Sequence, residues 1–422
     1  MAHHFLRIFA TPFIGAIMLV TPLSNGIRVV VLSAPGPVAR CALVINAGSR
    51  DENDDEHGLA HFVEHTIFKG TRKRRASHIL NRLDEVGGEL NAYTTKDETA
   101  IHATFLEGDL NRAAELIADM AFNSTFPERE LQKEREVIID EITSYEDTPS
   151  ELVFDEFEDL AFANTPLGHN ILGTPDSVSS FSGDDARRFI ERTHATDKMT
   201  FVYIGPQDYK HVLHVAQRFF GNVEPRSPRP QRAQVSSFAC FDKSVDKGTS
   251  QAHVVLGCPA PHNHDAQRLE MNVLSNILGG PSMNSRLSVA LRERNGIAYN
   301  VETSYTSFDD TGLFCIYFGT DPQNIERSMR IVRREVDKLL QSPLSSTAFN
   351  KVIRQYVSQT LMAADDSESL MLAAGRSAVI YGEVLSVYEI AALIRENVTP
   401  ESLLAAARQF LAPDNMSRLI YS

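Results

Sequence analysis

Two histidines and a glutamate lie within the run His61-Phe62-Val63-Glu64-His65, at a spacing that suits metal chemistry. On a helix, residues at i, i+3 and i+4 share one face, so His61, Glu64 and His65 would project from adjacent turns. Two imidazoles placed in this way can bind one Zn²⁺, with Glu64 close enough to act on the metal's bound water. Catalytic zinc commonly takes three protein ligands, so a third is required. A chance match or a solvated helix face is the alternative that the run alone leaves open.

A second predicted helix, at residues 128–146, carries the candidate third ligand, Glu141. Glu134 lies seven residues earlier on the same face, two turns back. One carboxylate can therefore bind the metal while the other supports the ligands. The stretch between them mixes Val and Ile with carboxylates. A glutamate on the apolar side of a helix needs a partner, and a metal or a metal ligand would supply one.

Alternating strands and helices surround these segments and predict an α+β layer, with α/β as the alternative. β-branched and apolar runs bounded by turn residues predict strands, and longer periodic segments predict helices. Strands are expected at 27–32 and 39–47, extended structure at 90–106, and helices at about 58–68, 77–86, 110–121 and 128–146.

The two halves of the chain look like copies of one another. Residues 57–70 resemble 267–280, residues 111–122 resemble 325–339, and residues 130–141 resemble 348–359. The identities are few, but the same order of elements predicts a duplication. A proline-rich polar stretch marks the junction. We expect an N-terminal extension (1–20), a metal-binding domain (21–222), a linker (223–236) and a homologous domain without metal (237–422).

The predicted copies differ at the metal-capable positions. His61, Glu64 and His65 fall opposite Met271, Leu274 and Ser275, and Glu134 and Glu141 fall opposite Val352 and Gln359. Core packing alone requires no such asymmetry. We therefore expect one metal site, in the first half.

Composition limits the function classes. The 422 residues carry a net charge of −14, which argues against broad nucleic-acid binding. Four scattered cysteines, Cys41, Cys240, Cys258 and Cys315, form no CxxC pair and predict free, buried thiols in a reducing compartment, hence the cytoplasm. A disulfide between distant strands is the alternative.

The N-terminal run at residues 9–20 is largely apolar but is interrupted by Thr11 and Pro12. It is too short to span a bilayer, so no stable membrane insertion is expected. Its features favour an ordinary extension over a signal peptide, which would instead make the protein periplasmic or exported.

The run HFVEH, followed 76 residues after His65 by Glu141 within the pattern ERExxxDE, resembles the pitrilysin (insulinase) family of inverted-motif zinc peptidases. The resemblance covers nearly the whole chain and is strongest to short bacterial members that are similar to the mitochondrial processing peptidase β subunit. It implies that His61, His65 and Glu141 bind zinc, one ion per chain. It also implies that Glu64 is the general base and that Glu134 supports the ligands.

The same resemblance implies substrate contacts. Asn91, Ala92 and Tyr93 would belong to an edge strand to which a peptide adds as a further strand. Arg292 and Tyr299, seven residues apart, would reach the substrate carbonyl near the zinc and stabilise an oxyanion. From the residues alone, Asn91 could equally be a turn residue. For Arg292 and Tyr299, the residues alone favour a surface arginine and a core tyrosine.

The function implied is that of a zinc metalloendopeptidase acting on peptides or unfolded segments. The family's architecture implies two homologous α+β domains, each an antiparallel-rich sheet with helices packed on one face, forming half of a clamshell chamber in a homodimer. The alternative function is a non-catalytic core or partner subunit of a processing-peptidase-like complex, which would predict lost zinc ligands. An enzyme active only with a separate partner chain is a third possibility.

Overall fold

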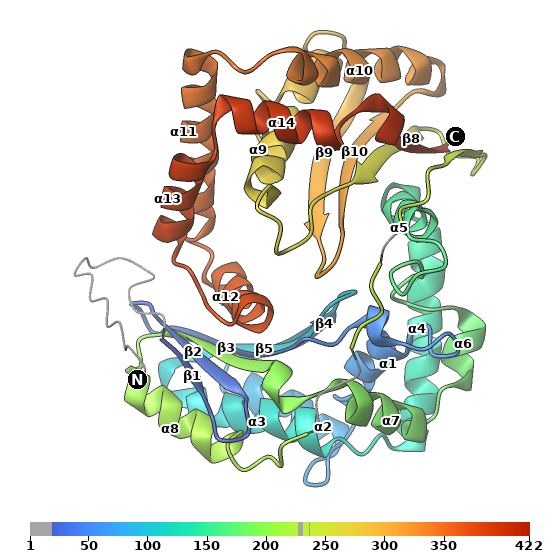
Figure 1. Ribbon diagram of the computed structural model, residues 1–422. Helices are drawn as coiled ribbons and strands as arrows, with labels where there is room; N and C mark the ends of the chain where they lie inside the picture. The colour runs from blue at the N-terminus through green and yellow to red at the C-terminus, as the bar shows by residue number, and fades with distance from the viewer. Residues whose placement is uncertain (1–18, 227–230, 236) are drawn as a thin grey trace. The chain divides into compact units, whose positions relative to one another are not determined.

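A computed structural model describes residues 19–226, 231–235 and 237–422 (Figure 1). The chain forms two compact units. Within the described residues, unit 1 comprises the chain up to Asp140 together with Ile171–Arg232 and Thr360–Ile390. Unit 2 comprises Glu141–Asn170, Ala233–Gln359 and Ala391–Ser422. Among the helices that the structure describes, none has the length and apolar character needed to cross a membrane.

Unit 1 contains a six-stranded sheet with the order β1-β2-β6-β3-β5-β4. β2 and β6 pair in parallel, and the other neighbours are antiparallel. The strands are β1 (Leu19–Pro22), β2 (Arg28–Ser33), β3 (Val38–Ile45), β4 (Glu89–Thr94), β5 (Thr99–Leu106) and β6 (Met199–Gly205).

Both faces of this sheet are buried. Successive side chains of a strand point to opposite faces, and all seven residues of β6 are buried. α3 (Leu110–Asn123) packs on β3 and β5, whereas α12 (Ser367–Tyr381), from the C-terminal half of the sequence, packs on β3 and β6. Figure 1 shows α3 and α12 on opposite sides of the sheet. Helices were expected on one face, so the cover that α12 provides is an addition.

Unit 2 repeats this topology. Its five-stranded sheet has the order β7-β11-β8-β10-β9. β7 and β11 are parallel and the other pairs antiparallel. The strands are β7 (Asp242–Val245), β8 (Ala252–Pro259), β9 (Ala298–Ser307), β10 (Gly312–Thr320) and β11 (Ser417–Tyr421). Without β1, the two sheets correspond strand for strand and direction for direction, which confirms the predicted α+β architecture and the duplication.

The helices of unit 2 include α9 (Arg268–Gly279), α10 (Ile325–Gln341), α11 (Ser346–Ala363), α13 (Val387–Asn397) and α14 (Pro400–Phe410). α5 (Pro149–Ala161), from the N-terminal half of the sequence, packs on β8 and β11. Its Phe157 belongs to a core cluster with Val255 and Leu419. Each sheet is thus covered by one helix from the other half of the sequence.

This exchange departs from the predicted contiguous domains at 21–222 and 237–422, because residues 141–170 and 360–390 join the unit of the other half. The two exchanged segments begin inside long helices, α4 (Glu128–Glu146) and α11, and the second of them ends inside α13. The expected extension at residues 1–20 lies outside the described residues except for the start of β1. The expected linker at 223–236 is described only in part.

The other helices of unit 1 are α1 (Leu59–Thr66), α2 (Ala76–Asp84), α6 (Pro175–Ser180), α7 (Gly183–Thr193) and α8 (Tyr209–Phe219). The helices predicted at 58–68, 77–86, 110–121 and 128–146 are confirmed as α1, α2, α3 and α4, and the extended stretch at 90–106 as β4 and β5.

The cysteines are free, as expected. Cys41, Cys258 and Cys315 are buried, but Cys240 is exposed. The expectation of burial was wrong for Cys240 because this residue precedes β7 and belongs to no strand.

Candidate metal centre

α1 places His61, Glu64 and His65 on adjacent turns, as predicted. The helix begins after Gly58, whose φ of 96° lies in the left-handed region. Leu59, Phe62 and Val63 anchor it in the core of unit 1. Among the candidate site residues, His61 is buried and Glu64 and His65 are half-buried, so part of the helix face remains accessible.

Glu52 fixes the start of this helix. Its carboxylate accepts hydrogen bonds from the backbone N–H groups of Gly58 at 3.0 Å and Ala60 at 2.7 Å. These are two of the N–H groups that a helix leaves without intrahelical partners. Burial raises the pKa of Glu52 well above its usual value, and the two backbone hydrogen bonds oppose that rise. The sequence analysis missed Glu52, which lies seven residues before the first residue of α1.

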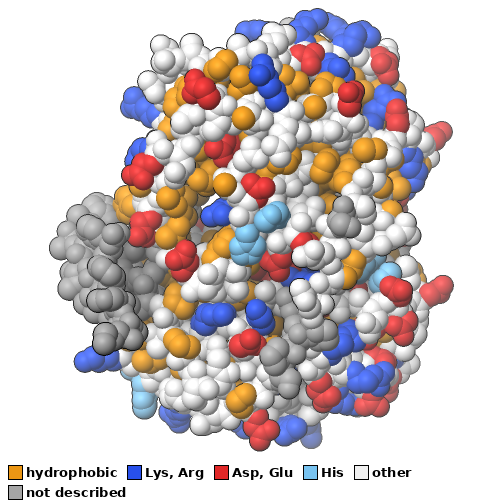
Figure 2. All heavy atoms as spheres, in the orientation of Figure 1, with side chains coloured by type: hydrophobic (Ala, Val, Ile, Leu, Met, Phe, Trp, Pro, Cys, Tyr) orange, Lys and Arg blue, Asp and Glu red, His pale blue; other side chains and the backbone are white. Residues whose placement is uncertain are grey.

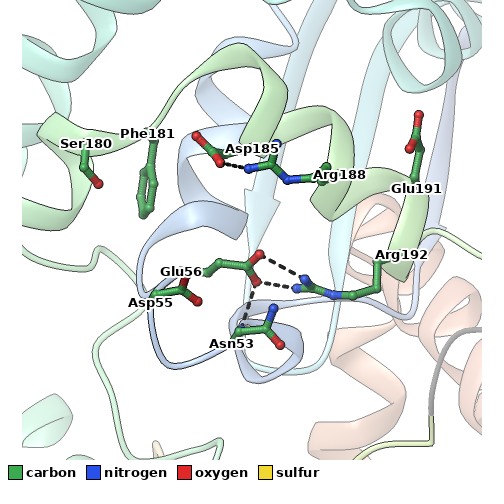
Figure 3. Close-up of a pocket in the computed structure, with 9 residues that line it drawn as sticks. All are labelled: Asn53, Asp55, Glu56, Ser180, Phe181, Asp185, Arg188, Glu191 and Arg192. Carbon is green, nitrogen blue, oxygen red and sulfur yellow. Dashed lines mark hydrogen bonds and ion pairs between the residues drawn. The ribbon is translucent and has the colours of Figure 1, made fainter.

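The loop that carries Glu52 is itself held by ion pairs. Arg192 binds Glu56, donating a hydrogen bond of 2.9 Å from one guanidinium nitrogen, and it also donates to the carbonyl oxygen of Asp51 at 3.0 Å. Figure 3 shows Arg192 and Glu56 pointing toward each other in a pocket of about 860 Å³. Phe181, which also lines this pocket, packs edge-on against Phe62 of α1. Arg192 and Glu56, two charged residues of this pocket, therefore hold the loop that leads into α1.

α4 brings the third candidate ligand to the two histidines. The ligand atoms of His61, His65 and Glu141 all lie within 4.8 Å of one another. The two imidazole rings are 4.6 Å apart. Glu141 is the first residue after the unit boundary, but it follows Asp140 on the same uninterrupted helix as Glu134. The predicted convergence of α1 and α4 is therefore present.

Glu134 contacts His65, in keeping with the supporting role that the resemblance implies. One carboxylate oxygen lies 3.3 Å from His65 Nδ1, and the other lies 2.7 Å from Lys69 Nζ. Burial acts to raise the pKa of Glu134, but the hydrogen bonds with His65 and Lys69 outweigh it and hold that pKa below its usual value. When Nδ1 of His65 carries the proton, the N–H group donates a hydrogen bond to this carboxylate, and Nε2 is left as the ligand atom. Lys69, which the sequence analysis missed, lies four residues beyond His65.

His61 is prepared for metal binding by its surroundings. Burial, followed by charge repulsion from His65, lowers the pKa of His61 from 6.5 to about 3. The imidazole is then neutral at neutral pH, and the neutral imidazole is the form that binds metals. Two imidazoles and one carboxylate form the His₂Glu donor set of many catalytic zinc sites. Within the described residues, no second group of three or more His, Cys, Asp or Glu side chains is arranged to hold an ion.

The predicted substrate strand is an edge strand. β4 pairs only with β5 among the described strands, so one of its backbone edges is not used within the sheet. Asn91 is exposed, and its side chain accepts a hydrogen bond from the backbone N–H of Ala92 at 2.9 Å. Tyr93 instead packs against the core of unit 1 and donates to Glu98 at 3.0 Å. The interpretation of Asn91 as a turn residue is wrong, because Asn91 lies within β4.

Arg292 and Tyr299 both lie in unit 2 and are exposed. Arg292 is in a π-helix (Ser288–Glu293), and its guanidinium lies 3.5 Å from Glu293. Tyr299 is 78% exposed on the edge strand β9, so the alternative interpretation as a core tyrosine is wrong. Their predicted action on a substrate stays a prediction.

Comparison with known proteins decides the family. Residues 28–175 match the insulinase family (peptidase family M16), and residues 180–356 match the peptidase M16 inactive domain. An uncharacterized zinc protease of Streptomyces coelicolor is 34% identical over 93% of this chain and 86% of its own length. The chain belongs to the M16 peptidase family. The resemblance stated from the HFVEH run and Glu141 is thereby confirmed.

A further relative and two solved structures match over nearly their whole length. The uncharacterized zinc protease YmxG of Bacillus subtilis is 31% identical over 94% of this chain and 96% of its own. A protease from Helicobacter pylori has the same fold, with a TM-score of 0.87 at 19% identity over 97% of this chain and all of that chain. A peptidase M16 inactive domain from Pseudomonas fluorescens also has a TM-score of 0.87, at 17% identity over 96% of this chain and 97% of its own.

Proposed function

We propose that this M16 family member is a zinc metalloendopeptidase that hydrolyses peptides or unfolded segments and holds one zinc ion per chain. The observation that carries the proposal is the convergence of His61, His65 and Glu141, with Glu64 on the same turn of α1 as His65. The relatives named zinc proteases support the choice of metal.

The chain's residues divide the work in the following way. His61, His65 and Glu141 hold the zinc, which when bound polarises a carbonyl and lowers the pKa of a water molecule. Glu64 accepts a proton from the attacking water and delivers it to the leaving amine. Glu134 keeps His65 in the tautomer that presents Nε2, and Glu52 keeps the start of α1 in place.

We further propose that the peptide adds to the open edge of β4 along Asn91, Ala92 and Tyr93. Backbone hydrogen bonds would then supply affinity without strong sequence demands. Arg292 and Tyr299 would donate to the oxyanion that develops on the scissile carbonyl. Both side chains are exposed and therefore accessible to a substrate.

We propose a homodimer in the cytoplasm that binds neither nucleic acid nor membrane. The free cysteines support a reducing compartment. On the face shown in Figure 2, basic and acidic side chains are interspersed, whereas a nucleic-acid site calls for a basic stripe. The alternative of a non-catalytic partner subunit predicts lost ligands, and here all three ligands and the base are present.

A paired measurement tests the proposal. Purified protein is expected to hold one equivalent of zinc and to cleave a quenched fluorescent peptide. Glu64→Gln should keep the zinc while turnover falls by about 10²–10⁴-fold, the usual contribution of a general base. A zinc-free protein, or normal cleavage by Glu64→Gln, would refute the peptidase assignment.

A further inference from the structure

A groove of about 580 Å³ lies in unit 2, on the sheet side that faces α10. Its floor is apolar: Leu256 of β8 and Ile316 of β10 are buried there, and Met416 just before β11 is partly exposed. One wall is α10, which contributes Met329, Val332 and Val336. Arg418 of β11 and Asp242 of β7 also line the groove. The groove has no part in the proposed peptidase chemistry.

The corresponding place in unit 1 is filled by a helix. By strand order and direction, β7 and β11 correspond to β2 and β6, and α10 corresponds to α3. In unit 1, α8 follows β6 and packs against both α3 and β2, as Figure 1 shows. No helix among the residues that the structure describes takes this place beside α10 and β7. The groove is therefore bounded by the counterparts of the elements that α8 packs against.

α8 shows what kind of segment fits between such elements. It is amphipathic, with Val212, Val215 and Ala216 buried and polar residues outward. Phe220, just beyond its end, lies 4.7 Å from the ring of Phe201 in β6 and 6.4 Å from the ring of Phe122 in α3. An apolar helix stripe about three turns long, ending in a large side chain, therefore matches this type of surface.

The charge at the rim of the groove selects among amphipathic helices. Four arginines line the groove (Arg330, Arg333, Arg334 and Arg418), against two acidic residues (Asp242 and Glu326). Arg418 is engaged by Asp242 at 2.7 Å, and Arg333 lies 3.4 Å from Asp337. Arg330 and Arg334 are exposed on α10. In a chain with a net charge of −14, this local excess of positive charge favours acidic residues beside the apolar stripe.

We propose that this groove binds an amphipathic helix with an acidic flank, supplied by a partner polypeptide, in the place corresponding to that of α8 in unit 1. The apolar stripe lies on Phe241, Met329 and Met416, which are partly exposed apolar side chains of the groove, and the acidic flank meets Arg330 and Arg334. Such helix-in-groove binding uses anchors at i, i+3, i+4 and i+7.

A designed peptide tests this proposal on the full-length, zinc-loaded chain, in the Glu64→Gln background so that the probe is not cleaved. The fluorescein-labelled peptide has about 18 residues, long enough to favour a helix, with the apolar spacing of α8 and glutamates beside the stripe. One matched peptide has lysines in place of the glutamates, and another has serines in place of the apolar residues. Binding is followed by fluorescence anisotropy. The glutamate peptide should bind at least about tenfold more tightly than either control.

Charge reversal on the protein locates the binding. Arg330→Glu with Arg334→Glu should reverse the preference toward the lysine peptide, whereas Arg354→Glu, at an exposed arginine of α11 outside the groove, should leave it unchanged. Equal binding of all three peptides, or a preference unaffected by the reversal, overturns the proposal. So does a groove filled by a second copy, seen in sedimentation as a dimer that Met329→Glu dissociates. Saturable binding of dodecanoate but not of the glutamate peptide also overturns it, in favour of a small amphiphile.

Discussion

The helix pairs α1–α4 and α9–α11 occupy corresponding places in the two units and differ in the residues between them. Between α1 and α4, the ligand atoms of His61, His65 and Glu141 lie within 4.8 Å of one another. In unit 2, the position of Glu141 is taken by Gln359, which accepts a hydrogen bond from Asn276 of α9 at 2.8 Å and donates one to Ser282 at 2.7 Å. An amide bridge thus joins α9 to α11, at the place where α1 and α4 present the metal site.

The rest of the second pair is packed as core. Met271 and Leu274, opposite His61 and Glu64, are 0% and 1% exposed. Ser275, opposite His65, lies 3.1 Å from the hydroxyl of Thr303 in β9. The scaffold therefore does not depend on the metal residues, and a few side chains separate the site from its copy.

The largest expected effect comes from exchanging Glu141 and Gln359, which occupy corresponding positions in α4 and α11. Glu141→Gln copies Gln359 into the α1–α4 pair and replaces an anionic ligand by a neutral amide. It should lower zinc affinity by more than the about 10–100-fold seen when only a supporting residue is lost, and peptidase activity should fall with it. Zinc titration and quenched-peptide cleavage measure both.

Gln359→Glu is the matched control, because it adds a carboxylate where no histidines converge. It should leave the zinc content at one per chain. If Glu141→Gln retained full zinc affinity and activity, the assignment of Glu141 as a ligand would be wrong.

A second comparison concerns the exchanged helices. A Cβ added at Gly375 of α12 would lie 2.6 Å from Val44 in β3, and one added at Gly257 in β8 would lie 2.6 Å from Phe157 of α5. Overpacking of this kind costs about 1–3 kcal/mol. Gly375→Ala regains about 1 kcal/mol because alanine favours a helix. Gly257→Ala should therefore lower the free energy of unfolding more than Gly375→Ala does, as measured in urea.

Gly108→Ala is the control for this pair, since its added Cβ would meet no atom within 4 Å. Glycine replacements as neutral as that control would show that neither helix packs tightly on its sheet.

The sequence was informative where local spacing determines geometry. His61, Glu64, His65, Glu134 and Glu141 were identified because a helix of known pitch places them, and the mismatch with Met271 and Gln359 pointed to one site. The exchange of α5 and α12 was not predictable, because it depends on contacts between residues about 100 or more positions apart, such as Phe157 with β8. Glu52 was missed because its partners are backbone groups, which no residue type reveals.

The smallest effect, the acid stability of the metal-free chain, separates His61 from its counterpart Met271. Burial and repulsion from His65 lower the pKa of His61 from 6.5 to about 3 in the folded state, whereas the unfolded chain keeps the ordinary value. Below pH 6.5 the unfolded state therefore binds the proton more readily. The stability due to neutral His61 is complete above that pH and is lost as the pH falls toward 3. At about pH 5 the loss should be roughly 1–2 kcal/mol.

His61→Met introduces the residue found at the corresponding position 271 and should remove this part of the pH dependence. Urea unfolding of chelator-treated protein at neutral and acidic pH measures it, and identical pH profiles for both proteins would show that His61 titrates normally in the metal-free chain.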